Sequence, residues 1–152
     1  SEGSANIAFL DPDQRAKKLG QGITADEARD TDVHIVVDTS AWVQLQDVGA
    51  VLKTTKAKRT VVIDHHPKGG QAIGGLSDRD ATASATGEMV FDLIHGAGGP
   101  WTRTALDGMY TAIMTDTGNF RFSNSSPEAH RVGPHLVHLG GGTARDHEVH
   151  TR

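Results

Sequence analysis

The sequence contains no cysteine, few aromatic residues and no long uninterrupted apolar run. Without cysteine the chain has no disulfide bonds and no thiolate metal ligands, so carboxylates and imidazoles are the ionisable groups left to hold a metal ion. Without a long apolar run no transmembrane helix is predicted, and the first residues lack the charged and apolar regions of a signal peptide. We therefore expect a soluble, cytoplasmic protein with no membrane partner.

The chain also lacks an excess of positive charge. Its formal net charge is −4 at pH 7, whereas a broad surface for nucleic acid or anionic lipid favours a basic balance. Small phosphorylated substrates are still compatible, because bound divalent cations supply positive charge locally. Glycine, in contrast, is abundant, and its 18 residues fall mostly in turn-like clusters. With 152 residues, the chain is long enough for a core, and we expect one compact unit.

The apolar pattern predicts an α/β fold, a layered sandwich with a mainly parallel sheet flanked by helices. Strands are predicted at 35–38 and 61–64, with a crossover helix over 43–53 between them. Weaker patterns indicate short strands at 7–10 and 72–76. Helices are predicted over 84–95, from an N-cap at Thr102 to just before Asp116, and over 127–139. Glu88, on the first of these helices, is expected to be solvated.

Three apolar segments end in side chains that can bind a metal ion. The first ends at Asp64, His65 and His66, the second at Asp38, and the third at Asp116, which a glycine turn follows. Open α/β sheets bind ligands outside the carboxyl ends of their strands, so we expect these side chains to share one pocket. Any one of the acids alone is better explained as a turn cap, but the three ends together favour a functional site.

Mixed carboxylate and imidazole ligands suit Mn²⁺, Mg²⁺, Fe²⁺ or Co²⁺. Two such ions a few ångströms apart are a standard device for phosphoester hydrolysis, and one acid must then bridge them. The ions lower the pKa of water and neutralise charge on the phosphoryl oxygens, so the protein has only to hold the geometry. The pattern therefore indicates a metal-dependent hydrolase of phosphoesters.

The sequence resembles the DHH phosphoesterase family, whose name describes the triplet at 64–66. The resemblance extends to an acidic motif at 36–40, the start of a middle helix at 83–88 and a last acidic motif at 116–122. Several motifs in the right order are a far stronger signal than the triplet alone. The last motif is most similar to the branch that contains oligoribonuclease/pAp phosphatase (nanoRNase) proteins, with cyclic-dinucleotide phosphodiesterases and RecJ-type exonucleases as relatives.

This resemblance implies a role for each matching residue. Asp38 would bridge two ions, and His65 and Asp116 would ligate one of them. His66 would face the substrate phosphate or assist the metal site, and Asp64 would support the ligands without touching the ion. The implied cofactor is Mn²⁺, with Mg²⁺ and Co²⁺ as alternatives, and two ions are expected in the complete enzyme.

Arg121, in the last motif, either pairs with a phosphate of the substrate or forms a surface ion pair; the sequence leaves both open. The implied substrate is short RNA or a small nucleotide such as pAp. A homodimer is an open alternative for the oligomeric state.

The sequence also departs from the family pattern. A first motif, with a histidine and paired acids, should precede everything described above, and only a poor match at 11–13 stands there. A C-terminal substrate-binding domain is absent as well. We therefore expect residues 1–152 to be a partial catalytic domain with weak activity or none. Two alternatives stay open, namely a catalytically silent domain that binds a nucleotide or a partner, and a cyclic-dinucleotide phosphodiesterase.

Overall fold

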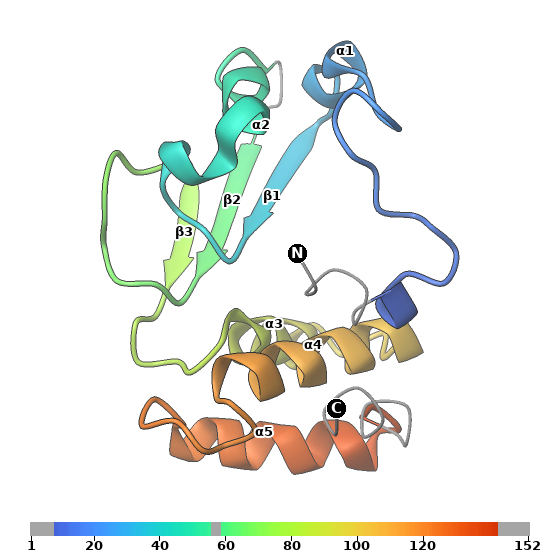
Figure 1. Cartoon of the computed structure of the whole chain (residues 1–152), viewed down its shortest axis with the longest axis vertical. Helices are drawn as coiled ribbons and strands as arrows, with labels where there is room; N and C mark the ends of the chain where they lie inside the picture. The colour runs from blue at the N-terminus through green and yellow to red at the C-terminus, as the bar shows by residue number, and fades with distance from the viewer. Residues whose placement is uncertain (1–7, 56–58, 143–152) are drawn as a thin grey trace. The chain divides into compact units, whose positions relative to one another are not determined.

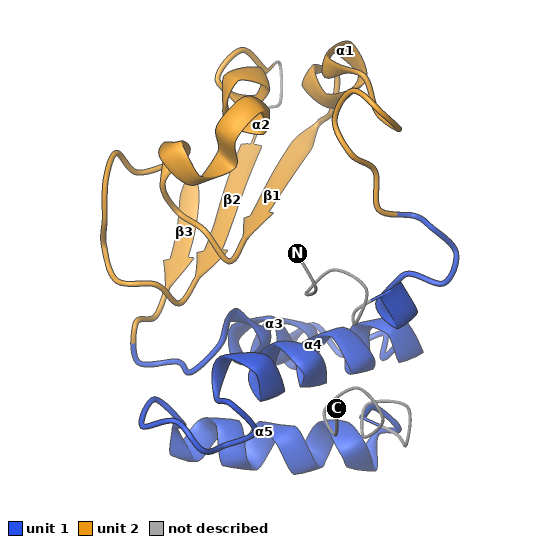
Figure 2. Ribbon diagram, in the orientation of Figure 1, with its two compact units in different colours: residues 1–15, 82–152 blue, residues 16–81 orange. Residues whose placement is uncertain are grey.

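The computed structural model describes residues 8–55 and 59–142. Backbone contacts divide the chain into two compact units, residues 1–15 with 82–152, called unit 1, and residues 16–81, called unit 2 (Figure 2). This corrects the expectation of one compact unit. The physical reason is that the helices of unit 1 and the sheet of unit 2 each bury an apolar cluster of their own.

Unit 2 contains a three-stranded parallel sheet in the order β1-β2-β3 (Figure 1). The strands are β1 (Val33–Val37), β2 (Arg59–Asp64) and β3 (Leu76–Arg79). The register pairs Val37 with Ile63, and Asp64 with Arg79, so the three carboxyl ends lie at one edge of the sheet. The predicted α/β class with a parallel sheet is confirmed.

The helices of unit 2 are short. α1 (Ala25–Arg29) begins with a capping box in which Thr24 and Glu27 exchange hydrogen bonds. The predicted helix over 43–53 is a 3₁₀ turn, η2 (Trp42–Leu45), followed by α2 (Gln46–Leu52). Gln46 has a φ of +47°, and this departure from helical geometry separates the two pieces.

The core of unit 2 forms where η2 and α2 cover one face of the sheet. Its buried residues are Val36, Val62 and Ile73, with Trp42, Leu45 and Leu52 packed against them. Val62 is fully buried and lies on the central strand, β2, between β1 and β3. This packing fixes the strands whose ends carry the candidate site.

Two predicted strands need correction. The one at 72–76 begins only at Leu76, because Gly74 and Gly75 interrupt the pattern and Gly75 has a φ of +117°. Ala72 forms just an isolated antiparallel bridge with Ala41. The predicted strand at 7–10 is a 3₁₀ turn over Ala8–Leu10, closed by a hydrogen bond from the Asp11 amide to the Ala8 carbonyl, and residue 7 lies outside the described residues.

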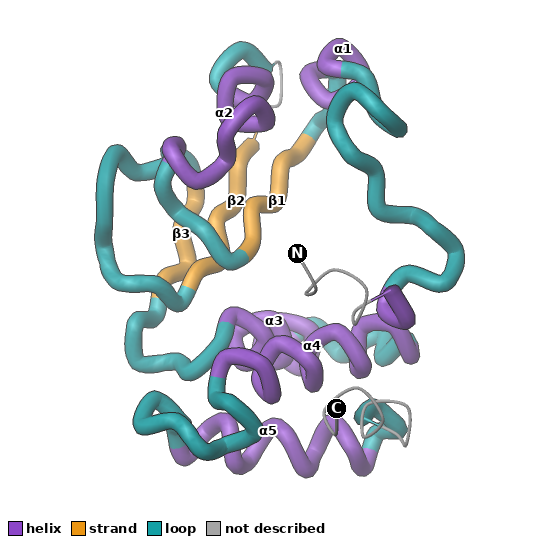
Figure 3. The backbone as a smooth tube through the Cα atoms, in the orientation of Figure 1, coloured by secondary structure: helices purple, strands orange, loops and turns teal. Residues whose placement is uncertain are grey.

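Unit 1 contains three longer helices, α3 (Thr86–Gly96), α4 (Arg103–Asp116) and α5 (Pro127–His138) (Figure 3). Thr102 and Ser126 cap α4 and α5 by accepting hydrogen bonds from backbone amides. Gly87 permits α3 to approach α4, since a Cβ there would lie 2.9 Å from the Met109 carbonyl oxygen. The buried core residues come from all three helices and the residue before α3: Ala85, Phe91, Leu106, Met109, Ile113, Ala129, Val132 and Leu136.

The predicted helices of unit 1 are confirmed. Asp116, expected just past the end of the second helix, is the last residue of α4. The apolar run at 110–115 belongs to a helical face, because Leu106, Met109 and Ile113 are buried at helical spacing. Among the described residues, no helix is long and apolar enough to cross a bilayer.

Candidate metal centre

The candidate site of unit 2 begins where β1 ends, at Asp38. The Asp38 amide donates a hydrogen bond to the Ile63 carbonyl at 2.9 Å, so this residue adds one further bond between the two strands. Its backbone then turns into the left-handed region, with a φ of +63°. Aspartate tolerates this conformation better than most residues do. The turn leaves the carboxylate 58% exposed beside the end of β2.

Asp64 closes β2, and its carboxylate is fully buried, with 0% exposure. Its Oδ1 atom lies 2.8 Å from Nδ1 of His66 and accepts a hydrogen bond from the His66 amide at 3.1 Å. A carboxylate accepts and cannot donate, so the imidazole donates through Nδ1 and the neutral ring keeps a lone pair on Nε2. One oxygen therefore fixes both the backbone turn and the orientation of the ring.

The electrostatics of Asp64 favour its ionised form. Burial alone would raise the pKa of the Asp64 carboxyl, but hydrogen bonds from Ser40 and from the side chain and amide of His66 outweigh this effect, and the pKa is lowered. A buried negative charge thus lies directly beneath the histidine pair. The Asp64 carboxylate orients the His66 ring through its contact with Nδ1.

The side chains of Asp38, His65 and His66 come together at this edge of the sheet, with potential ligand atoms all within 4.8 Å of one another. His65 Nε2 is 3.5 Å from Asp38 Oδ1, and His66 Nδ1 is 4.0 Å from the same oxygen. Ligands about 2.0–2.2 Å from a shared ion lie at most roughly 4.4 Å apart, so the contact between Asp38 and His65 fits one divalent cation. His66 lies beside this pair, with its Nδ1 atom engaged by Asp64. Within residues 8–55 and 59–142 these three side chains are the one such group.

Arg79 also belongs to this edge, and the sequence analysis did not single it out. It is the last residue of β3, and its Nη2 donates to the His66 carbonyl at 2.9 Å. The guanidinium thus holds the turn that carries both histidines. Recognition of β3 as a third parallel strand would have pointed to Arg79, but the two glycines before Leu76 conceal the strand pattern.

The structure therefore brings together Asp38, Asp64, His65 and His66, all from unit 2. The two other predicted site residues, Asp116 and Arg121, are in unit 1. The carbonyl oxygen of Asp116 accepts a hydrogen bond from Asn124 Nδ2 at 3.0 Å. Arg121 is exposed, and its Nε donates to the Gly118 carbonyl at 3.2 Å.

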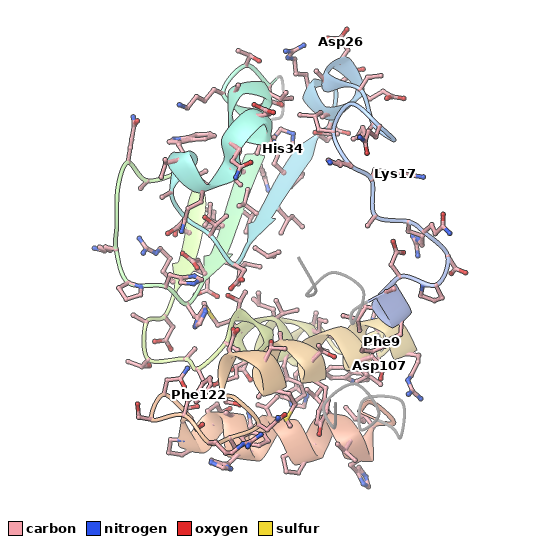
Figure 4. All side chains as sticks on the ribbon, viewed as in Figure 1. Phe9, Lys17, Asp26, His34, Asp107 and Phe122 are labelled. Atoms are coloured by element: carbon pink, nitrogen blue, oxygen red, sulfur yellow. The ribbon has the colours of Figure 1, made fainter. Side chains whose placement is uncertain are left out.

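The segment after Asp116 forms a tight turn that leads from α4 towards α5 (Figure 4). Thr117 is buried, and its hydroxyl donates to the Ile113 carbonyl and accepts from the Phe120 amide. Gly118 has a φ of +56°, and a Cβ there would lie 2.5 Å from the ring of Phe122. The turn therefore requires glycine at this position for both conformation and space.

A sequence profile described as the DHH family, N-terminal domain, matches residues 3–113. The chain is 44% identical over 78 residues, 51% of its length, to the bifunctional oligoribonuclease and PAP phosphatase NrnA of Thermus thermophilus. It is 32% identical over 115 residues, 76% of its length, to the uncharacterized protein MG371 homolog of Mycoplasma pneumoniae. The crystal structure of an exopolyphosphatase-related protein from Bacteroides fragilis matches 76% of this chain with a TM-score of 0.70 at 24% identity.

These matches cover only part of each relative. The chain spans 24% of the Thermus protein, 34% of the Mycoplasma protein and 34% of the Bacteroides chain. The structural match supports the α/β fold described above.

Proposed function

Because this chain belongs to the DHH family, we propose that it carries part of a metal-dependent phosphoesterase centre. The observation that carries this proposal is the meeting of Asp38, His65 and His66 at the end of a parallel sheet, above the buried charge of Asp64. Residues 1–152 are, in this proposal, one partial catalytic domain.

The proposed ligands are Asp38 as the bridging acid, with His65 and Asp116. The proposed ion is Mn²⁺, with Mg²⁺ and Co²⁺ as alternatives, because mixed oxygen and nitrogen donors suit these ions. When bound, two such ions supply charge neutralisation and a more acidic water molecule. The role of Asp116 rests on the family resemblance of its motif alone.

The remaining residues of the proposed centre orient other groups, bind phosphate or transfer a proton. Asp64 keeps Nδ1 of His66 protonated, so that Nε2 is the nitrogen able to meet a substrate phosphate or take up a proton. Arg79 holds the backbone of the same turn through the His66 carbonyl. Arg121 is proposed as a phosphate-binding residue, because a guanidinium matches phosphate geometry.

The proposed substrate is short RNA or a phosphorylated nucleotide such as pAp. The name of the Thermus relative, an oligoribonuclease and PAP phosphatase, supports this choice over a cyclic dinucleotide. A catalytically silent nucleotide-binding domain is the second candidate.

The test is Mn²⁺-dependent release of nucleotide from a diribonucleotide, or of phosphate from pAp. It compares this chain with a version extended to the full length of its relatives, each with and without Asp38→Asn. We expect hydrolysis by the extended protein and its loss in Asp38→Asn. Equal activity of the extended protein with and without the Asp38 carboxylate would overturn the proposal. An inactive extended protein that still binds nucleotide would favour the silent domain.

A further inference from the structure

Glu88 is an unusual residue for the first turn of an amphipathic helix, because it is only 2% exposed. Both carboxylate oxygens are used within unit 1. Oε1 accepts a hydrogen bond from the Ser84 amide at 2.9 Å, and Oε2 accepts one from the Ser126 hydroxyl at 3.1 Å. This corrects the expectation of a solvated Glu88. A hydrogen bond to the preceding turn is ordinary helix capping, but the bond to Ser126, 38 residues away, is not needed for a cap.

The two serines extend the network to the segment before α5. The Ser84 hydroxyl donates to the Asn124 carbonyl at 2.6 Å and accepts from the Ser126 amide at 2.6 Å. Ser126 in turn caps α5 by accepting from the Ala129 amide. Glu88 therefore joins the start of α3, the start of α5 and the loop that precedes α5.

The network ends at Asp116. The side-chain nitrogen of Asn124 donates to the Asp116 carbonyl at 3.0 Å, at the point where α4 ends. Three consecutive links, through Ser84 and Asn124, thus connect the buried Glu88 carboxylate to this residue. Burying a carboxylate among apolar helices is costly unless hydrogen bonds compensate, and here Ser84 and Ser126 satisfy both oxygens. These bonds tie the loop before α5 to the start of α3.

We propose that Glu88 is a positioning residue that sets the backbone of Asp116 through Ser84, Ser126 and Asn124. The inference rests on the proposed function, in which Asp116 is a metal ligand. Outer groups that orient ligands typically change metal affinity by about 10- to 100-fold when removed. The whole network lies within unit 1.

The experiment compares wild type with Glu88→Ala, Glu88→Gln and Asn124→Ala. Asp92→Asn is the control, because Asp92 is an exposed acid on the same helix and outside the network. The first readout is amide exchange at Asn119 and Ser126 without metal. The second is Mn²⁺ affinity, followed through paramagnetic broadening of the Asp116 resonances. Melting of unit 1 checks that each variant is folded.

We expect faster exchange and about 10-fold or greater loss of Mn²⁺ affinity in Glu88→Ala. Glu88→Gln, which keeps an acceptor for the Ser84 amide, should recover part of the affinity. Asn124→Ala removes the hydrogen bond to the Asp116 carbonyl without changing the core. This variant therefore tests the positioning role even if Glu88→Ala does not fold. Unchanged affinity in Asn124→Ala, with Asp116 broadened as in wild type, would overturn the positioning role alone. A wild-type chain whose Asp116 is never broadened would instead overturn the proposed ligand itself.

Discussion

The carboxylate of Asp64 holds His66 twice, through Nδ1 of the ring at 2.8 Å and through the backbone amide at 3.1 Å. The first contact selects the tautomer, and the second fixes the turn that follows β2. The acceptor is fully buried, whereas the ring of His66 is 46% exposed, so the contacts join the interior of unit 2 to its surface. The orientation of the histidine pair is therefore set by the end of the strand before any ligand arrives.

Asp64→Asn is expected to destabilise unit 2 by about 1–3 kcal/mol at neutral pH, because the hydrogen bonds from Ser40 and from the side chain and amide of His66 lose their charged acceptor. The pKa of Asp64 is lowered in the folded state, so its contribution to stability is complete above the ordinary pKa of 3.8 and is lost as pH falls through the lowered value. The difference between wild type and variant should thus shrink in acid.

Urea denaturation followed by resonances of β1 to β3 measures this effect. Asp78→Asn, at an exposed acid of β3, is the matched control and should change little. If the difference in free energy of unfolding between wild type and Asp64→Asn became larger in acid, the lowered pKa assigned to Asp64 would be wrong.

Glu88 is expected to give unit 1 the opposite pH dependence. Burial raises the pKa of Glu88 above the ordinary 4.5, although hydrogen bonds from Ser126 and Ser84 oppose the shift. The folded state then binds the proton more tightly than the unfolded state, so stability falls as pH rises from about 4.5 through the raised value. Glu88→Gln should remove this slope. Denaturation followed by resonances of α3 to α5 measures this pH dependence of stability. If the same dependence persisted in Glu88→Gln, another group would be its cause.

Arg79→Ala is expected to loosen the turn that carries the two histidines. The loss of the bond to the His66 carbonyl should cost about 1 kcal/mol and speed amide exchange at residues 65 and 66. Arg59→Ala is the matched control, because Arg59 is the first residue of β2, at the other end of the sheet. Equal exchange in the two variants would show that Arg79 does not hold the turn.

Phe91→Ala tests the core of unit 1. Phe91 is fully buried among residues of α3, α4 and α5, so its removal should cost about 3–5 kcal/mol. Val137→Ala, at a half-exposed residue of α5, should cost less than about 0.5 kcal/mol. Thermal or urea denaturation of the helical unit checks both values, and similar costs would contradict the assignment of the core.

The sequence predicted the strand ends of unit 2 because β-branched runs at 35–37 and 61–63 stop abruptly at charged residues. Parallel pairing then requires Asp38 and the histidines to meet, as they do. The helix that ends at Asp116 was predicted from its N-cap at Thr102 and from the helical spacing of Leu106, Met109 and Ile113. The sequence could not show whether Asp116 meets the strand ends, because a helix end carries no register with a sheet.

Sequence patterns could not predict the polar contacts between residues far apart in the chain. Glu88 lies at a helical position that is usually solvated, and its burial depends on Ser126, 38 residues later. Arg79 was missed for a similar reason, because its partner is a backbone carbonyl 13 residues earlier. Neither contact leaves a periodic signal.

The most direct test of the proposed metal centre is a Mn²⁺ titration of this chain, followed by the imidazole resonances of His65 and His66. Asp38→Asn is the informative variant, because asparagine tolerates the left-handed backbone of this position and removes only the charge. We predict that Mn²⁺ broadens both rings before that of His34, and that Asp38→Asn weakens the affinity at least about tenfold. Equal affinity in the variant, or broadening of His65 and His66 no earlier than His34, would contradict the account.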